Sequence, residues 1–305
     1  MTLALIAGTG GLPTHLAKVL LDRGDAPVIC ELEGFDAEID LTVPRIKFRL
    51  ETLGTFLATL QEAGITRVCM AGAMRRPDIR AEEIDARTAP IVPRLMAALA
   101  RGDDGTLREF VALFEEHGMD VVGAAEIAPE LLPPAGVMTE TEPEDLTATL
   151  AAARAALAEM GAADAGQALV VRDREVIARE DARGTDAMLG DLASPTNSPD
   201  VAADPVSWAM DPVGDLLGDA ADRLSGREAE RARLSGLGGV LYKAPKPGQE
   251  RRVDLPVIGP ATAINAAAAG LKGIAIEAGG VMVLDRDAVV RSLDAQDMFL
   301  AVVRP

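Results

Sequence analysis

LALIAGTGGLP, residues 3–13, opens the chain with an aliphatic run that stops at a glycine-rich turn. Such a short, uncharged run is typical of a strand buried in a parallel sheet. Glycines after a strand let backbone N–H groups approach a phosphate, and Pro13 suits the first turn of a helix. The stretch predicts a strand, a turn and a helix, with Gly10 and Gly11 as candidate phosphate-binding residues. A tight turn without a ligand explains the same residues.

The same alternation continues through the first third of the chain. Strand-like runs lie at 27–31, 67–71 and 120–124, and helical periodicity lies at 12–22, 51–63, 89–100 and 105–117. This rhythm predicts βαβ units that form an α/β domain with a parallel sheet covered on both faces. Three prolines at 129, 133 and 134 place the domain boundary near residue 135.

The remainder predicts a mixed α+β domain. An alanine-rich helix is expected over 143–160, with Thr141 as its cap and Glu144 as the capping-box partner. Strands are expected at 167–172, 175–179, 239–243, 273–277, 281–284 and 299–303. Residues 191–236 are rich in Pro, Asp and Ser and indicate a solvated insertion. A lid or a membrane-touching flap around Trp208 is the alternative.

Composition excludes several classes of function. The 305 residues carry a formal net charge of −18, which disfavours nucleic acid and anionic membranes as partners. The only cysteines, Cys30 and Cys69, lie in apolar runs and are predicted to be core residues. With only two histidines, any metal is expected to be hard and bound through oxygen. The N-terminus lacks the features of a signal peptide, so we expect a cytoplasmic protein.

The densest chemical signal is KAPKPGQERRVDLP, residues 243–256, which gathers four cations, an amide and two carboxylates. Lys246 and Arg252 are candidates to neutralise phosphate oxygens as charge builds during cleavage of a pyrophosphate. Asp254 is a candidate ligand for Mg²⁺, which takes few protein carboxylates. The alternative is an ordinary surface ion pair between Arg252 and Asp254.

Other glycine-flanked segments add weaker candidates. Gly72 follows a strand at the sheet edge where ligands usually bind. Asp103 and Asp104 could contact a ribose, although a capping box formed by Thr106 and Glu109 explains that helix start more simply.

Three further segments belong to the second domain. Thr185 and Asp186 follow a glycine at an expected helix start, and Thr262 lies at another. The turn at 277–280 is typical of a hairpin first and of a ligand loop second.

Taken in order, these segments resemble the LpxI-type UDP-2,3-diacylglucosamine pyrophosphatases of lipid A synthesis. The carrying motifs are IAGTGGLP, GAMRRP, GDDGTLREF, GMDVVGAAEIAPELLPPAG, GQALVVRDREVIAREDARGTDAML, KAPKPGQERRVDLPVIGPAT and AGLKGIAIEAGGVMVLDR. The resemblance implies a Rossmann-like nucleotide-binding domain over 1–135, a family-specific catalytic domain over 136–305, and a ligand cleft between them. It also implies Mg²⁺-dependent hydrolysis to UMP and 2,3-diacylglucosamine 1-phosphate (lipid X), a homodimer, and at most peripheral contact with the inner membrane.

Asp254 is the residue that matches the family's functional aspartate. By motif match, the candidates to bind the lipid-linked UDP-sugar are Gly10, Gly11, Thr185, Asp186, Lys246, Gln249, Ala278, Gly279 and Gly280. Further substrate-binding candidates are Gly72, Asp103, Asp104, Gln167, Lys243 and Thr262. Two other functions stay open: a NAD-dependent oxidoreductase, in which Glu31 would bind ribose after the glycines at 8 and 10, and a non-catalytic UDP-sugar-binding protein.

Overall fold

The computed structural model describes residues 2–74, 79–163, 165–193 and 236–305. It contains two compact units. Unit 1 comprises Met1–Leu132 and Gly248–Leu255, and unit 2 comprises Pro133–Pro247 and Pro256–Pro305. The sequence places the segment Gly248–Leu255 in the second domain. In the structure, this segment packs with unit 1. Most of the expected insertion, residues 194–235, lies outside the described part.

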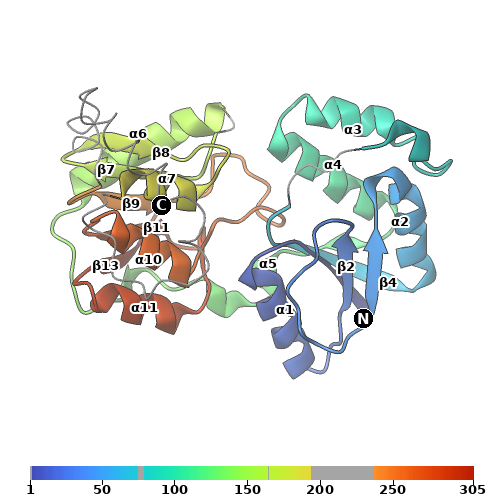
Figure 1. The fold of residues 1–305 in the computed structure, drawn as a ribbon, viewed down its shortest axis with the longest axis horizontal. Coiled ribbons are helices and arrows are strands. Elements are labelled where there is room, and N and C mark those ends of the chain that lie inside the picture. Colours follow the sequence, from blue (N-terminus) through green and yellow to red (C-terminus); the bar gives the residue numbers. More distant parts are fainter. Residues whose placement is uncertain (1, 75–78, 164, 194–235) are drawn as a thin grey trace, which may run out of the picture. The chain divides into compact units, whose positions relative to one another are not determined.

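Unit 1 is built on a five-stranded parallel sheet in the order β3-β2-β1-β4-β5 (Figure 1). The strands are β1 (Thr2–Ala7), β2 (Val28–Leu32), β3 (Arg45–Phe48), β4 (Ile65–Ala71) and β5 (Asp120–Val121). This is the strand order of a Rossmann-like fold, with the switch point between β1 and β4. The predicted parallel sheet is confirmed.

Helices α1 (Gly11–Asp22), α2 (Leu53–Glu62), α4 (Asp103–Glu116) and α5 (Ala124–Ile127) lie against strands of this sheet. The other helical elements among the described residues of unit 1 are η1 (Leu50–Thr52), η2 (Ala81–Glu83), α3 (Val92–Leu99) and η3 (Pro129–Leu131). One core joins Ile6 of β1 and Val68 of β4 to Phe56 of α2 and Phe114 of α4. Val253, from the distant segment Gly248–Leu255, packs against the same core.

The predicted capping box at the start of α4 is wrong. The helix begins at Asp103, after Gly102 with φ 96°. The Thr106 hydroxyl donates to the Gly102 carbonyl at 2.9 Å, and Glu109 accepts from Arg94 Nε at 2.7 Å. Neither side chain therefore accepts a hydrogen bond from the backbone N–H groups at the helix N-terminus.

Unit 2 holds a six-stranded mixed sheet in the order β6-β13-β11-β9-β7-β8. The strands are β6 (Gly136–Val137), β7 (Ala168–Arg172), β8 (Glu175–Arg179), β9 (Val240–Lys243), β11 (Gly273–Glu277) and β13 (Phe299–Val303). β9, β11 and β13 are parallel, and the outer pairings are antiparallel. β10 (Val257–Ile258) and β12 (Met282–Val283) form a separate parallel pair. The expected hairpin at 277–280 is therefore wrong, because β11 and β12 belong to different sheets.

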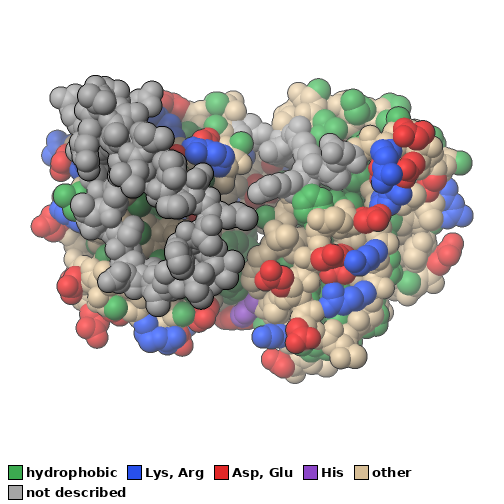
Figure 2. All heavy atoms as spheres, viewed as in Figure 1, with side chains coloured by type: hydrophobic (Ala, Val, Ile, Leu, Met, Phe, Trp, Pro, Cys, Tyr) green, Lys and Arg blue, Asp and Glu red, His purple; other side chains and the backbone are tan. Residues whose placement is uncertain are grey.

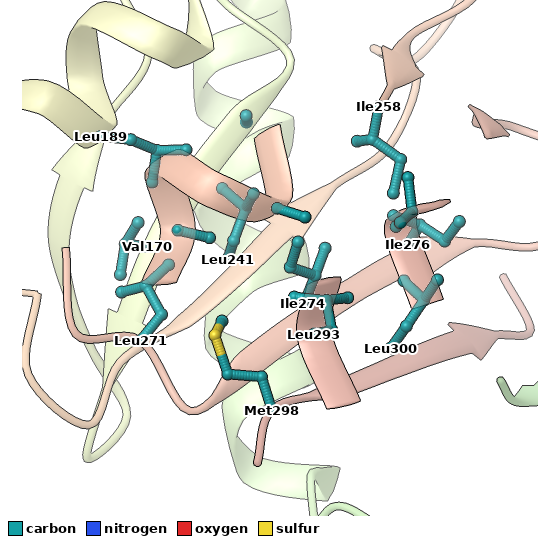
Figure 3. Packing of buried hydrophobic residues seen from close by; sticks show 14 of the residues in the cluster. Val170, Leu189, Leu241, Ile258, Leu271, Ile274, Ile276, Leu293, Met298 and Leu300 are labelled. Atoms are coloured by element: carbon teal, nitrogen blue, oxygen red, sulfur yellow. The ribbon is translucent and has the colours of Figure 1, made fainter. Parts of the chain in front are cut away.

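Within the described residues of unit 2, the helices are α6 (Thr147–Ala162), α7 (Thr185–Leu192), α10 (Pro260–Ala268) and α11 (Arg286–Asp294). Figure 3 shows the core in which Leu189 of α7 and Leu293 of α11 meet Leu241 and Ile274 of the sheet. Tyr242, the next residue of β9, points into the core on the other face, formed with α6. The mixed α+β prediction is thereby confirmed.

The predicted start of α6 at residue 143 is too early. The helix begins at Thr147, whose backbone N–H donates to Asp145 Oδ1 at 2.9 Å. Asp145, and not Thr141, thus binds the backbone at the helix start.

The two cysteines are core residues, as predicted. Cys30 and Cys69 are fully buried and are not joined in a disulfide. Burial raises the pKa of each thiol to about 12, so neither is a nucleophile at neutral pH. Among the helices of the described residues, none combines the length and low charge needed to cross a bilayer.

Candidate functional site

The glycine turn after β1 is locked to the turn after β4. Thr9 and Ala73 exchange backbone hydrogen bonds of 2.9 and 3.0 Å. A side chain on Gly8 would place Cβ 2.5 Å from the Ala73 carbonyl oxygen, and one on Gly72 would place it 2.8 Å from backbone carbon of Gly8. Gly8 and Gly72 are therefore required by the close approach of two turns, whatever ligand binds there.

Gly10 has a different reason to be glycine. Its φ is 96°, it precedes the first residue of α1, and an added Cβ would meet nothing within 4 Å. Both Gly10 and Gly11 are exposed at the switch point of the sheet. Positive φ next to a helix N-terminus is a geometry that can present backbone N–H groups to an anion.

Glu31, the acid expected to bind ribose in a NAD-dependent enzyme, is used inside the fold. Its side chain is 2% exposed and accepts hydrogen bonds from Ala37 N at 3.1 Å and from Arg45 Nη1 at 2.9 Å. The carboxylate thus fastens the segment after β2. This engagement argues against the oxidoreductase alternative, which needs Glu31 at a ribose.

Asp254 lies in a short turn of unit 1. The backbone N–H groups of Val253 and Asp254 both donate to the Glu250 carbonyl, at 3.2 and 3.1 Å. The buried Gln249 amide donates to the Asp254 carbonyl and to its Oδ2. Gln249 therefore orients the Asp254 carboxylate from within the same segment, and its predicted contact with substrate stays a prediction.

Helix α4 holds this segment at its first residues. Asp104 Oδ1 accepts from Glu250 N at 3.0 Å, and Asp104 Oδ2 accepts from Arg108 Nε at 2.7 Å. Arg108 Nη2 donates to the Gly248 carbonyl. Asp104, expected to contact substrate, thus binds protein backbone in this structure. Asp103 is the first residue of α4, and its side chain lies outside the described part.

Arg252 is held between two carboxylates. Its Nη1 donates to Glu115 Oε1 of α4 at 2.7 Å, and its Nε and Nη2 donate to the two Glu250 oxygens at 3.0 Å each. These hydrogen bonds keep the pKa of Glu250 below its usual range. The expected surface pair of Arg252 with Asp254 is replaced by a pair with Glu250. The predicted phosphate contact of Arg252 stays a prediction.

A second group of predicted residues meets at one edge of the unit 2 sheet. β9 ends at Lys243, β7 begins directly after Gln167, and α7 begins at Thr185. Lys243 Nζ donates to Thr185 Oγ1 at 2.8 Å, and the Thr185 hydroxyl donates to Glu180 Oε1 at 2.6 Å. Glu180 Oε2 accepts from the Gln167 backbone N–H. The result is a polar chain that runs from a buried ammonium to a carboxylate.

Two loops at the same edge touch each other. An added Cβ on Gly280 would lie 2.7 Å from Pro245 Cδ, so the turn at 278–280 packs against the loop that follows β9. Ala278 is half-buried and Gly279, with φ 69°, is exposed. Lys246 is half-buried in the loop after β9. Parallel strands β9 and β11 explain the contact, because their carboxyl ends lie side by side.

Asp186 and Thr262 lie at helix starts. Asp186 Oδ1 accepts from Asn265 Nδ2 of α10 at 3.0 Å, which joins α7 to α10. Thr262 is buried, and its hydroxyl accepts weakly from Gly259 N at 3.5 Å.

Sequence reasoning missed Glu180, Arg108 and Glu115. Each contacts a predicted site residue. Arg108 and Glu180 lie within quoted motifs, but no local pattern marks any of the three as a site residue.

Charges of both signs are mixed on the face of the described residues that Figure 2 shows. Figure 2 shows basic side chains beside acidic ones over much of the visible face of the coloured residues. The pairing of Arg94 with Glu116 at 2.7 Å and of Arg252 with Glu115 at 2.7 Å illustrates the pattern.

Across the described ranges, no cluster of three or more His, Cys, Asp or Glu side chains could hold a metal ion. A protein-only metal cage is therefore not formed by this part of the chain.

Comparison with known proteins covers nearly the whole chain. Residues 2–131 match the LpxI N-terminal domain, and residues 134–203 and 220–301 match the LpxI C-terminal domain. The unmatched residues 204–219 fall within the stretch interpreted as an insertion. The chain is 38% identical to the UDP-2,3-diacylglucosamine pyrophosphatase LpxI of Caulobacter vibrioides, over 99% of this chain and 98% of that protein. With both domains matched in order, the chain belongs to the LpxI family.

Proposed function

We propose that this chain hydrolyses the pyrophosphate bond of UDP-2,3-diacylglucosamine with Mg²⁺, giving UMP and 2,3-diacylglucosamine 1-phosphate in lipid A synthesis. The observation that carries the proposal is the 38% identity, across 99% of the chain, to a relative named for that substrate and reaction. The folded positions of the predicted residues support it, because polar side chains are held in defined orientations beside α4 in unit 1 and at the end of β9 in unit 2.

Hydrolysis requires a water molecule to attack one phosphorus while the bridging oxygen leaves with the other phosphate. The attacking water loses a proton, and negative charge builds on the phosphoryl oxygens. Asp254 is the proposed residue for holding the ion or for orienting the water. Gln249 supports this role because its amide fixes the carboxylate through Oδ2 and through the Asp254 carbonyl.

The Asp254 carboxylate is suited to a magnesium ion that enters with the substrate. Mg²⁺ is usually held by one or two protein carboxylates and completes its six positions with water and substrate phosphate. Asp254 would supply the protein oxygen. Bound there, the ion would neutralise phosphate charge and favour attack by water.

Cationic side chains of unit 2 supply the proposed charge neutralisation. Lys243 is 8% exposed, and its ammonium is directed by the Thr185 hydroxyl. Charge–charge interactions are stronger where water is excluded, so a buried ammonium stabilises phosphate more than an exposed one. Lys246, in the loop after β9, is the second proposed cation.

The direct test is release of UMP. The purified protein is incubated with UDP-2,3-diacylglucosamine, with Mg²⁺ or with excess EDTA, and UMP is measured by chromatography. Hydrolysis in H₂¹⁸O shows which phosphorus the water attacks, because the label appears in only one product. Absence of UMP at saturating substrate and Mg²⁺ would refute the proposed reaction, and binding without turnover would favour a UDP-sugar-binding protein.

Asp254→Asn tests the residue assignment. The variant should fold normally, since Asn retains the oxygen that accepts from Gln249, and its kcat should fall by about two orders of magnitude or more. Full activity in this variant would remove Asp254 from the mechanism. A homodimer is part of the proposal, and light scattering of the same preparation tests it.

A further inference from the structure

We propose that Arg108 is a positioning residue that keeps Asp254 in its working orientation by anchoring the segment Gly248–Leu255 to helix α4. The role of Asp254 in catalysis rests on the proposed function above. The anchoring itself rests only on contacts within unit 1.

The Arg108 guanidinium makes two directed contacts. Nε donates to Asp104 Oδ2 at 2.7 Å, and Nη2 donates to the Gly248 carbonyl. The other oxygen of Asp104 accepts from Glu250 N at 3.0 Å. One arginine and one aspartate, a single helical turn apart on α4, therefore bind the main chain of the segment at two residues.

The anchored end of the segment is connected to Asp254 by hydrogen bonds. Glu250, whose N–H is held by Asp104, accepts from Asp254 N through its own carbonyl at 3.1 Å. Gln249 lies between the two anchored residues and donates to Asp254 Oδ2. A shift of the Gly248–Glu250 backbone would therefore disturb the hydrogen bonds that Gln249 and Glu250 make with Asp254.

Arginine is suited to this arrangement and lysine is not. The planar guanidinium reaches Asp104 and the Gly248 carbonyl with two different nitrogens at a fixed angle, whereas an ammonium is a single point. The Arg108 side chain is 46% exposed, and an exposed ion pair four residues apart on a helix adds little to stability. Its removal should therefore loosen the segment far more than it destabilises the fold.

Arg94 provides a matched control. It binds Glu109 and Glu116 of the same helix, with distances of 2.7 Å to both, and it is similarly exposed at 42%. Arg94→Ala thus removes an arginine–carboxylate contact from α4 without touching the Asp254 segment.

The experiment compares kcat and KM for the wild type, Arg108→Ala, Arg108→Lys and Arg94→Ala. We expect kcat of Arg108→Ala to fall about 10- to 100-fold, because small displacements of a catalytic group have effects of this size. KM should change less than about threefold, and Arg108→Lys should recover part of kcat at most. An unchanged kcat, a rise in KM alone, or an equal loss in Arg94→Ala would overturn the proposal.

A double mutant tests whether Arg108 acts through Asp254. In the Asp254→Asn background, Arg108→Ala should reduce the residual kcat less than about threefold, because coupled residues are not additive. The full single-mutant loss on top of Asp254→Asn would refute positioning.

Amide hydrogen exchange separates this inference from the proposed function. Peptides that cover Gly248–Leu255 should exchange faster in Arg108→Ala than in Arg94→Ala. If the wild type releases no UMP, the proposed reaction fails, yet the exchange comparison still decides whether Arg108 anchors the segment. Equal exchange in the two variants would show that it does not.

Discussion

Replacing Thr185 by valine tests the polar chain at the edge of the unit 2 sheet. Valine has nearly the shape of threonine, so packing around the start of α7 is retained while the hydroxyl is lost. The change removes the acceptor for Lys243 Nζ at 2.8 Å and the donor to Glu180 at 2.6 Å. Thr185 is 7% exposed, so water cannot easily substitute for either hydrogen bond.

The expected loss follows from the charges of the partners. A hydrogen bond to a charged group contributes about 1.5–3 kcal/mol, and two such bonds are removed. We therefore expect Thr185→Val to lower the free energy of unfolding by about 3 kcal/mol or more. For a domain of this size, that loss corresponds to a fall in melting temperature of about 6–12 °C.

Thermal and urea unfolding followed by circular dichroism measure this loss, with Thr185→Ser as the matched control. Serine keeps the hydroxyl and removes one methyl group, which should reduce stability by only about 1 kcal/mol. The reasoning fails if the valine variant unfolds within about 0.5 kcal/mol of wild type, the range of neutral surface changes. It also fails if serine is as destabilising as valine.

Two further changes probe unit 1. Because hydrogen bonds from Arg252 lower the pKa of Glu250 from its usual 4.5, wild type should be more stable than Glu250→Gln above that pH. The difference should shrink as pH falls through the lowered pKa; urea unfolding at a series of pH values measures it, and a constant difference would contradict this account. Gly72→Ala should exceed Gly10→Ala in stability loss by about 1–3 kcal/mol, because both have positive φ but only Gly72 lacks room for Cβ. Equal losses in thermal unfolding would show that the contact with Gly8 relaxes.

The parallel sheet of unit 1 could be predicted because β1, at its centre, is almost purely aliphatic and its neighbours β2 and β4 contain short apolar runs. β3 escaped prediction because its sequence, RIKF, carries charges at Arg45 and Lys47. An edge strand exposes one side, so its composition resembles that of a loop. β6 and β10 are only two residues long, which is too short for any periodicity.

The residues of the candidate site were easier to select than their partners. Lys243 and Thr185 stood out by type and by position at a strand end and a helix start. Glu180 did not stand out, because a single glutamate after a strand is usually an ordinary solvent-exposed residue. Contacts such as Glu250 to Asp104, separated by 146 residues, leave no local pattern in the sequence. Only the folded chain shows that Arg252 binds Glu115 and Glu250.

The same separation explains why the sequence does not show which unit the Asp254 segment packs with. Read along the chain, it lies between stretches that both belong to unit 2, bounded by Pro247 and Pro256. Its immediate segment nevertheless packs with unit 1, where α4 binds the backbone and Val253 enters the core. A fragment that begins after residue 132 would retain Asp254 in its sequence but lose every α4 contact that holds it. The orientation of the Asp254 carboxylate therefore depends on contacts with α4. Its chemistry must be measured on a chain that contains both segments.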